Sequence, residues 1–112
     1  MAKNQRYSEA KHISLPAPYD IESGAPVAVG GFKGIALIDA KKDAPVTVWL
    51  DGSWDVTVTG QVKPGDTVYI TPAGVLNTTA ASNQPWGLAL GTKAAAAGVV
   101  EVAPLGKTVP TA

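Results

Sequence analysis

Turn-forming residues recur about every 8–12 residues along this sequence from Gly24 onward, and segments of that length suit short β-strands. Between the glycines, prolines, aspartates and asparagines lie short runs rich in β-branched and aromatic residues: PVAV, GIALID, VTVWL, SWDVTVTG, TVYIT, VLNT, WGLAL and GVVEV. No segment repeats apolar residues at helical spacing over a useful length. The sequence therefore predicts an all-β fold, either a small β-barrel or a sandwich of short antiparallel strands.

The first part of the chain differs in character from the rest. Residues 1–22 are largely polar, show neither a strand period nor a helix period, and include the segment Pro16-Ala17-Pro18. Proline fixes its own φ and pushes the preceding residue toward extended geometry, so a helix is disfavoured here. We predict an extended N-terminal arm over residues 1–22 and a single β-barrel domain over residues 23–112. Simple terminal disorder is the alternative for the arm.

The segment VTVWLDGSWDVTV predicts a β-hairpin whose register depends on its apolar residues. Asp51-Gly52 suggests a two-residue turn, but that register places the apolar residues of the two strands on opposite faces. A three-residue connection restores one apolar face, with Leu50 opposite Trp54, Val48 opposite Val56 and Val46 opposite Val58. In this register Trp54 belongs to the core and Trp49 points outward.

Two further segments, SGAPVAVGGFKGIAL and PGDTVYITPAGVLNT, share the order glycine, valine, second apolar residue and glycine-containing turn. Two explanations stay open: equivalent hairpins, and a chance match, which two segments of this length readily give in a glycine-rich β protein. In the second segment Asp66 follows a Pro-Gly pair. That position is typical of a turn residue whose carboxylate accepts hydrogen bonds from nearby backbone N–H groups.

The reactive side chains form no catalytic or metal-binding pattern. The chain has no cysteine and a single histidine, His12, which lies in the predicted arm. A nucleophile beside a base is therefore not expected in the body of the protein. The acidic residues of the body come without the spacing of a calcium-binding loop, and no phosphate-binding loop is present. We predict no enzymatic activity, no cofactor and no metal.

Charge and hydropathy exclude two classes of partner. Nine basic and nine acidic side chains give a formal net charge of zero, which removes the long-range attraction used by nucleic-acid binders. The most apolar run, AAAAGVV, is far shorter than the roughly 20 residues of a membrane-spanning helix. The start of the chain, MAKNQRYSEAKHISL, lacks the apolar stretch of a secretory signal. We expect a soluble protein made in a cytoplasm, with neither nucleic acid nor membrane as its partner.

Several segments, in this order, resemble a family of small tailed-phage proteins, the capsid cement or decoration proteins. They are MAKNQRYSEAKHISLPAP, SGAPVAVGGFKGIALIDA, VWLDGSWDVTV, VKPGDTVYITPAGVLNT and WGLALGTKAAAAGVVEV. The resemblance implies a compact β-barrel that binds the outside of the expanded phage head, where neighbouring major capsid protein subunits meet, and stabilises the shell without catalysis. It also implies a homotrimer at or near threefold positions of the virion, made in the cytoplasm of the bacterial host.

This reading assigns contact roles to a few residues. In the arm, Arg6, Tyr7, Ile13 and Leu15 are expected to contact the capsid, and an extended segment of that kind can become ordered on a partner. Trp49 is expected to form an outward contact surface. Trp86 fits either the core or the surface. The alternative function is a carbohydrate- or receptor-binding β-module on a virion or cell surface, which requires two aromatic side chains on one exposed face.

Overall fold

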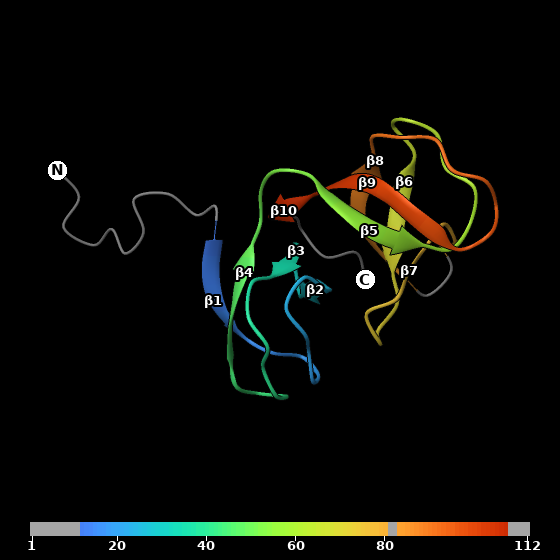
Figure 1. Ribbon diagram of the computed structural model, residues 1–112. Helices are drawn as coiled ribbons and strands as arrows, with labels where there is room; N and C mark the ends of the chain where they lie inside the picture. The colour runs from blue at the N-terminus through green and yellow to red at the C-terminus, as the bar shows by residue number, and fades with distance from the viewer. Residues whose placement is uncertain (1–11, 81–82, 108–112) are drawn as a thin grey trace, which may run out of the picture.

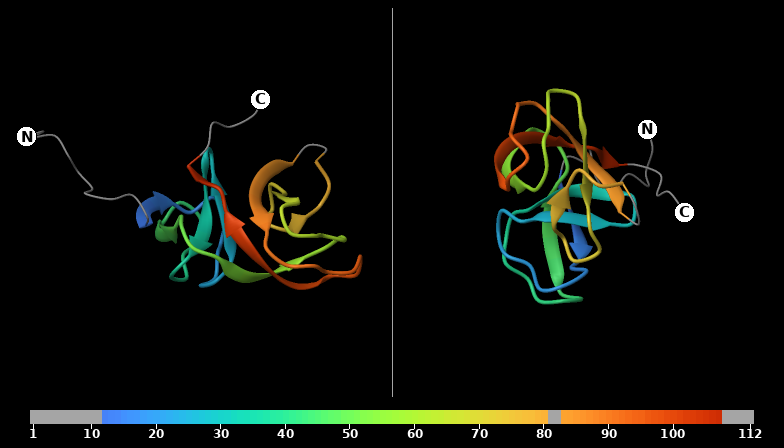
Figure 2. Two further views of the ribbon diagram at one scale, coloured as in Figure 1. Left: turned by 90° about the horizontal axis from the view of Figure 1, so that it is seen from above. Right: turned by 90° about the vertical axis from the view of Figure 1, so that its right-hand side faces the viewer.

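The computed structural model describes residues 12–80 and 83–107, which form two antiparallel β-sheets (Figure 1). No helix is assigned within those ranges, so none there is long and apolar enough to cross a membrane. The predicted all-β fold of short antiparallel strands is confirmed. Seen from above, β1 and β4 lie toward one end of the molecule and β8 and β6 toward the other (Figure 2).

The first sheet contains five strands in the order β1-β4-β3-β10, with β2 on the other edge of β3. Their bounds are β1 His12–Pro16, β2 Pro26–Val29, β3 Phe32–Ala36, β4 Pro45–Trp49 and β10 Gly106–Lys107. Part of the predicted arm therefore forms β1, which pairs with β4 along its whole length. Because β3 pairs with β2 on one edge and with β4 and β10 on the other, it is the central strand of this sheet.

The second sheet has the order β5-β9-β8-β6-β7. Its strands are β5 Trp54–Val58, β6 Thr67–Ile70, β7 Leu76–Asn77, β8 Gln84–Ala89 and β9 Gly98–Pro104. A single parallel bridge joins Thr59, just after β5, to Asn77 in β7. The sheet therefore curls until its two outer strands approach each other at one end.

The larger of two hydrophobic clusters lies on the inner face of the second sheet and reaches β3 of the first sheet. Its buried members are Ile35, Val56, Val58, Val62, Val68, Ile70, Leu76, Trp86, Ala89, Val100 and Val102. Trp86 is fully buried, and its indole Nε1 donates a hydrogen bond of 3.1 Å to the carbonyl oxygen of Val27 in β2. The assignment that the sequence left open is thus resolved: Trp86 is a core residue that joins the two sheets.

The second cluster belongs to the first sheet and the loops that fold over it. It consists of Ile13, Ala17, Ile21, Val27, Ala36, Val46, Val48 and Leu50. Bridging hydrogen bonds in both directions between Ile21 and Ala40 hold two of these loops together. Residues on both sides of the predicted boundary between arm and domain therefore contribute to one cluster.

The predicted hairpin between residues 46 and 58 is wrong. β4 pairs with β1 and β3, whereas β5 pairs with β9, so the chain passes from one sheet to the other at residues 51–53. The apolar pattern is satisfied in a different way, because Val46, Val48 and Leu50 are buried in the cluster of the first sheet and Val56 and Val58 in the larger cluster of the second sheet. Alternation specifies which face is buried, but it does not specify the partner strand.

The two segments with similar sequences each form a hairpin, which answers the question that the sequence left open. β2 and β3 are connected by Gly30 and Gly31, and β6 pairs with β7 in the second sheet. Each hairpin follows the same kind of turn, since Gly24 and Gly65 have φ values of 87° and 91°. Positive φ at the third residue of a four-residue turn favours glycine. The two hairpins are therefore alike in entry turn and strand order, one in each sheet.

Asp66 occupies the turn position that the sequence predicted. Its carboxylate accepts a hydrogen bond of 2.9 Å from the backbone N–H of Lys63, and its own N–H donates to the Lys63 carbonyl. Because the group is exposed, we expect Asp66→Ala to lower the free energy of unfolding by only about 1 kcal/mol. Chemical denaturation of the two proteins measures this difference; a loss above about 3 kcal/mol would contradict a purely local role.

Candidate interaction surface

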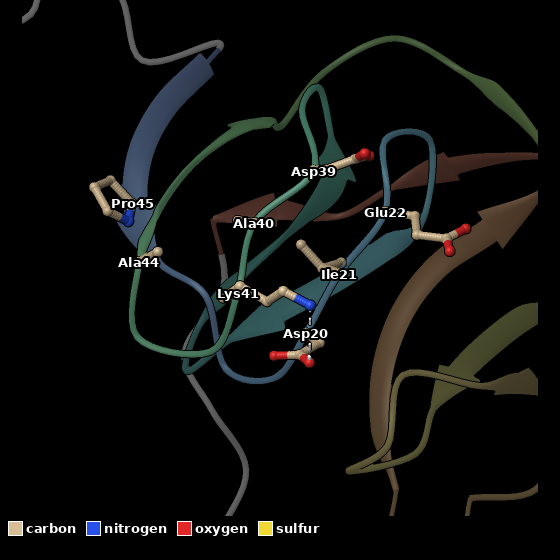
Figure 3. A pocket seen from close by; sticks show the side chains of 8 residues that line it. All are labelled: Asp20, Ile21, Glu22, Asp39, Ala40, Lys41, Ala44 and Pro45. Atoms are coloured by element: carbon tan, nitrogen blue, oxygen red, sulfur yellow. Dashed lines mark ion pairs between the residues drawn. The ribbon is translucent and has the colours of Figure 1, made fainter.

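A surface hollow in the first sheet gathers acidic side chains, and the close-up shows how they lie (Figure 3). One oxygen of Asp20 accepts a hydrogen bond from the backbone N–H of Lys42, while the other lies 3.7 Å from the Lys41 amine. Asp39 accepts a hydrogen bond of 2.7 Å from the N–H of Ser23. These carboxylates fix the loops around the hollow, and the exposed ion pair contributes little to stability. The positions of Asp20 and Asp39 are therefore explained by their contacts with these loops.

The part of the chain that the structure describes contains no group of three or more side chains able to hold a metal ion. The ring of His12 is used in a local contact, since it stacks on the indole of Trp49 with centroids 4.9 Å apart and planes 17° apart. The side chains that most often carry metal or acid–base chemistry are thus separated or used in local contacts.

Lys33 is the most unusual charged side chain among the described residues, since only 1% of its surface is exposed. Burial lowers the pKa of its amine, a property that catalytic lysines often share. However, Nζ donates a hydrogen bond of 2.8 Å to the Gly30 carbonyl, and a substrate has no access to it. Burial similarly raises the pKa of the Tyr19 phenol, whose hydroxyl points to the Pro26 carbonyl at 3.4 Å. Lys33 and Tyr19 therefore both have a structural role in the packing of the protein.

The stacked pair of His12 and Trp49 forms an aromatic surface on β1 and β4. His12 is exposed and Trp49 is partly exposed, and the two residues face each other across the β1–β4 pairing. Trp49 was placed outward by a hairpin register that is wrong, but the pairing of β1 with β4 still leaves part of its ring accessible. Flat aromatic rings of this kind bury a large area on contact with a partner.

The four arm residues predicted to contact the capsid differ in what the structure says of them. Arg6 and Tyr7 lie outside the described residues. Ile13 is buried, with 8% of its surface exposed, and packs in the core of the first sheet, where Leu15 also packs while remaining partly exposed. In the folded chain, therefore, Ile13 has its side chain directed inward, and the exposed residues of β1 are His12, Ser14 and Pro16.

A second exposed surface, which was not predicted from the sequence, lies on the outer face of the second sheet. Leu88, Leu90 and Val99 are 42%, 48% and 65% exposed. The buried members of the same strand are the indole of Trp86 and the small side chain of Ala89. Strict alternation in WGLAL would place Trp86, Leu88 and Leu90 on one face. The pairing of β6 with β8 shifts register between Val68 and Tyr69, and at this irregularity Trp86 is buried while the leucines are exposed.

A comparison with models of protein families gives one match, between residues 7–104 and the family described as phage cement protein. The matched range includes β1 to β9 and thus nearly all of both sheets. A search of curated proteins gives no match.

Proposed function

Since this chain belongs to the phage cement protein family, we propose that it binds the outer surface of the expanded head where major capsid protein subunits meet, and that it stabilises the shell there. Cement proteins are structural components of the phage capsid, so membership places the chain among virion proteins. The observation that carries the proposal is the family match over residues 7–104. The finer points, namely the partner subunit, a homotrimer on the capsid and synthesis in the host cytoplasm, belong to the proposal.

The character of the described residues supports a binding role rather than catalysis. Their one acidic hollow is explained by loop hydrogen bonds, and the buried Lys33 amine is out of reach of a substrate. Accessible apolar or aromatic side chains occur on both sheets. Contacts of modest strength to several subunits act with a high effective concentration, so none of these surfaces has to be large.

Within this proposal, the N-terminal side of the molecule contacts the capsid. We expect Arg6 and Tyr7, which precede β1 in the sequence, to contribute to this contact, together with the exposed part of the Trp49 ring. Leu15 can contribute through its exposed part. For Ile13, which is buried against the first sheet, a contact requires β1 to separate from β4, so we expect its contribution to be indirect.

We expect Trp49→Ala to weaken binding to heads about tenfold, because loss of an aromatic contact at an interface commonly costs more than 1 kcal/mol. Deleting residues 2–11, which leaves β1 intact, should weaken binding by at least as much. Quantitative co-sedimentation with heads measures both effects, and circular dichroism tests whether the fold is retained. Folded variants that bind as tightly as the original chain would show that this side of the molecule does not contact the capsid.

The stabilising role is tested by heating expanded heads with and without the bound protein. A cement protein adds contacts that must break before the shell opens, so the temperature of disruption should rise as sites fill. Electron microscopy or light scattering follows the loss of intact heads. Heads that carry a full complement of the protein yet break at the same temperature would contradict the stabilising function.

A further inference from the structure

We propose that the outer face of the second sheet is a second capsid-binding surface, and that it fits an apolar patch bordered by lysine or arginine on a neighbouring capsid subunit. This inference rests on the proposed cement function and adds to it a surface, a partner chemistry and a reason for bridging. It is carried by the positions, exposure and charge of five side chains: Leu88, Leu90, Val99, Glu101 and Asp55.

The strand register brings the apolar members of this face together. Leu88 pairs with Ala103 and with Thr67, and Leu90, two residues further along the chain, donates its N–H to the carbonyl of Glu101. Val99 lies two residues from Glu101 on β9. Since residues two apart share a face, the two leucines and Val99 form one continuous exposed strip.

The charges of the face are all of one sign. Asp55 pairs with Glu101 across β5 and β9, both residues are exposed, and the Glu101 carboxylate accepts a hydrogen bond from the Ser53 hydroxyl. No lysine or arginine occurs in the described strand residues β5, β6, β8 and β9. Two carboxylates therefore border the apolar strip without a cation from their own sheet.

The negative charge of this face indicates whether it binds a second copy of this chain or a different protein. If the same face of two copies met around a twofold axis, four carboxylates would gather at a surface that loses water, and like charges brought together oppose association. A partner that presents apolar side chains with basic groups around them matches both features. On a phage head the abundant neighbour is the capsid subunit, so we assign that chemistry to it.

The position of the face explains how one molecule could join two subunits. The aromatic surface of His12 and Trp49 lies on β1 and β4 of the first sheet, whereas the acidic and apolar face lies on the second sheet, toward the other end of the molecule (Figure 2). Two surfaces that face different directions can bind two neighbouring subunits at once. Each contact then raises the effective concentration of the other.

The test compares head binding across a salt series. Leu90→Ser should weaken binding about tenfold at every salt concentration, because truncating a buried apolar contact removes energy that salt does not screen. The double variant Asp55→Asn with Glu101→Gln should bind more weakly at low salt and equally at high salt, since salt screens charge pairs. Ile38→Ser, which alters a residue that is also 48% exposed, and Glu22→Gln serve as matched controls in the first-sheet loops.

The outcomes separate this inference from the function on which it rests. Failure of the unaltered protein to bind heads would overturn the cement function together with this inference. Tight binding by the original chain that neither face variant alters would overturn the inference alone. Sedimentation velocity without heads adds one further check: if the original chain is an oligomer and Leu90→Ser dissociates it, the face joins copies of this chain and the assignment to a capsid subunit is wrong.

Discussion

Replacing Trp86 with alanine is expected to lower the free energy of unfolding by about 3–5 kcal/mol, the range found when large aromatic residues are removed from a core. Trp86 is fully buried, with none of its surface accessible to solvent. The change also removes the indole N–H that donates to the Val27 carbonyl. Because total stability of a domain is about 5–15 kcal/mol, this substitution takes away a large fraction of it.

Urea denaturation followed by far-ultraviolet circular dichroism measures the effect. Trp86→Phe, which keeps an aromatic ring but not the donor, should lie between the original chain and Trp86→Ala. Trp54→Ala is the matched control: this tryptophan is only partly buried at the edge of the same cluster, and its Nε1 donates to the carbonyl of Asp51 in the adjacent loop. A loss from Trp86→Ala no greater than that from Trp54→Ala would contradict the assignment of Trp86 to the centre of the core.

Gly34→Ala is expected to be as disruptive as the loss of a core side chain, although it adds only one carbon. A Cβ atom at this position would overlap the carbonyl oxygen of Trp49 and approach Cγ1 of Val48 at 2.9 Å. Overpacking of a well-packed site commonly costs about 1–3 kcal/mol. Here the obstructing atom is the backbone of the adjacent strand, so relief requires β3 and β4 to separate, and we expect a cost of about 3 kcal/mol or more.

The same denaturation measurement applies, with the yield of folded protein as a second readout. Gly98→Ala is the matched control, because Gly98 also lies in a strand but a Cβ there meets its nearest neighbour, Cδ of Lys93, at 3.6 Å, which is ordinary contact. Gly98→Ala should change stability by less than about 1 kcal/mol. Equal stability of the two alanine variants would mean that β3 and β4 are not as close as the structure places them.

The class of fold could be predicted from the sequence because turns and short β-rich runs alternate along nearly the whole chain. The identity of the strand partners could not. The valines of residues 46–58 are buried, as their alternation indicates, but the same alternation is satisfied by a hairpin and by two strands in different sheets. Long-range pairings such as β1 with β4 and β5 with β9 depend on the packing of the whole protein, and local pattern does not encode them.

The surfaces were only partly predictable for a related reason. Size and polarity alone suggest that Leu88 and Leu90 are buried, yet both are exposed. A register shift in the pairing of β6 with β8 between Val68 and Tyr69 breaks the regular alternation of β8, so Trp86 is buried while Leu88, two residues further on, is exposed. By contrast, the turn role of Asp66 followed from its immediate neighbours, since it depends on local geometry.

The most direct test of the cement function is co-sedimentation of the purified protein with expanded heads that lack it, at increasing protein concentration. A cement protein should bind until a fixed ratio to the major capsid protein is reached, because the shell offers a definite number of equivalent junctions. That ratio would also count the sites. Absence of binding, or binding that rises without saturation, would contradict the account.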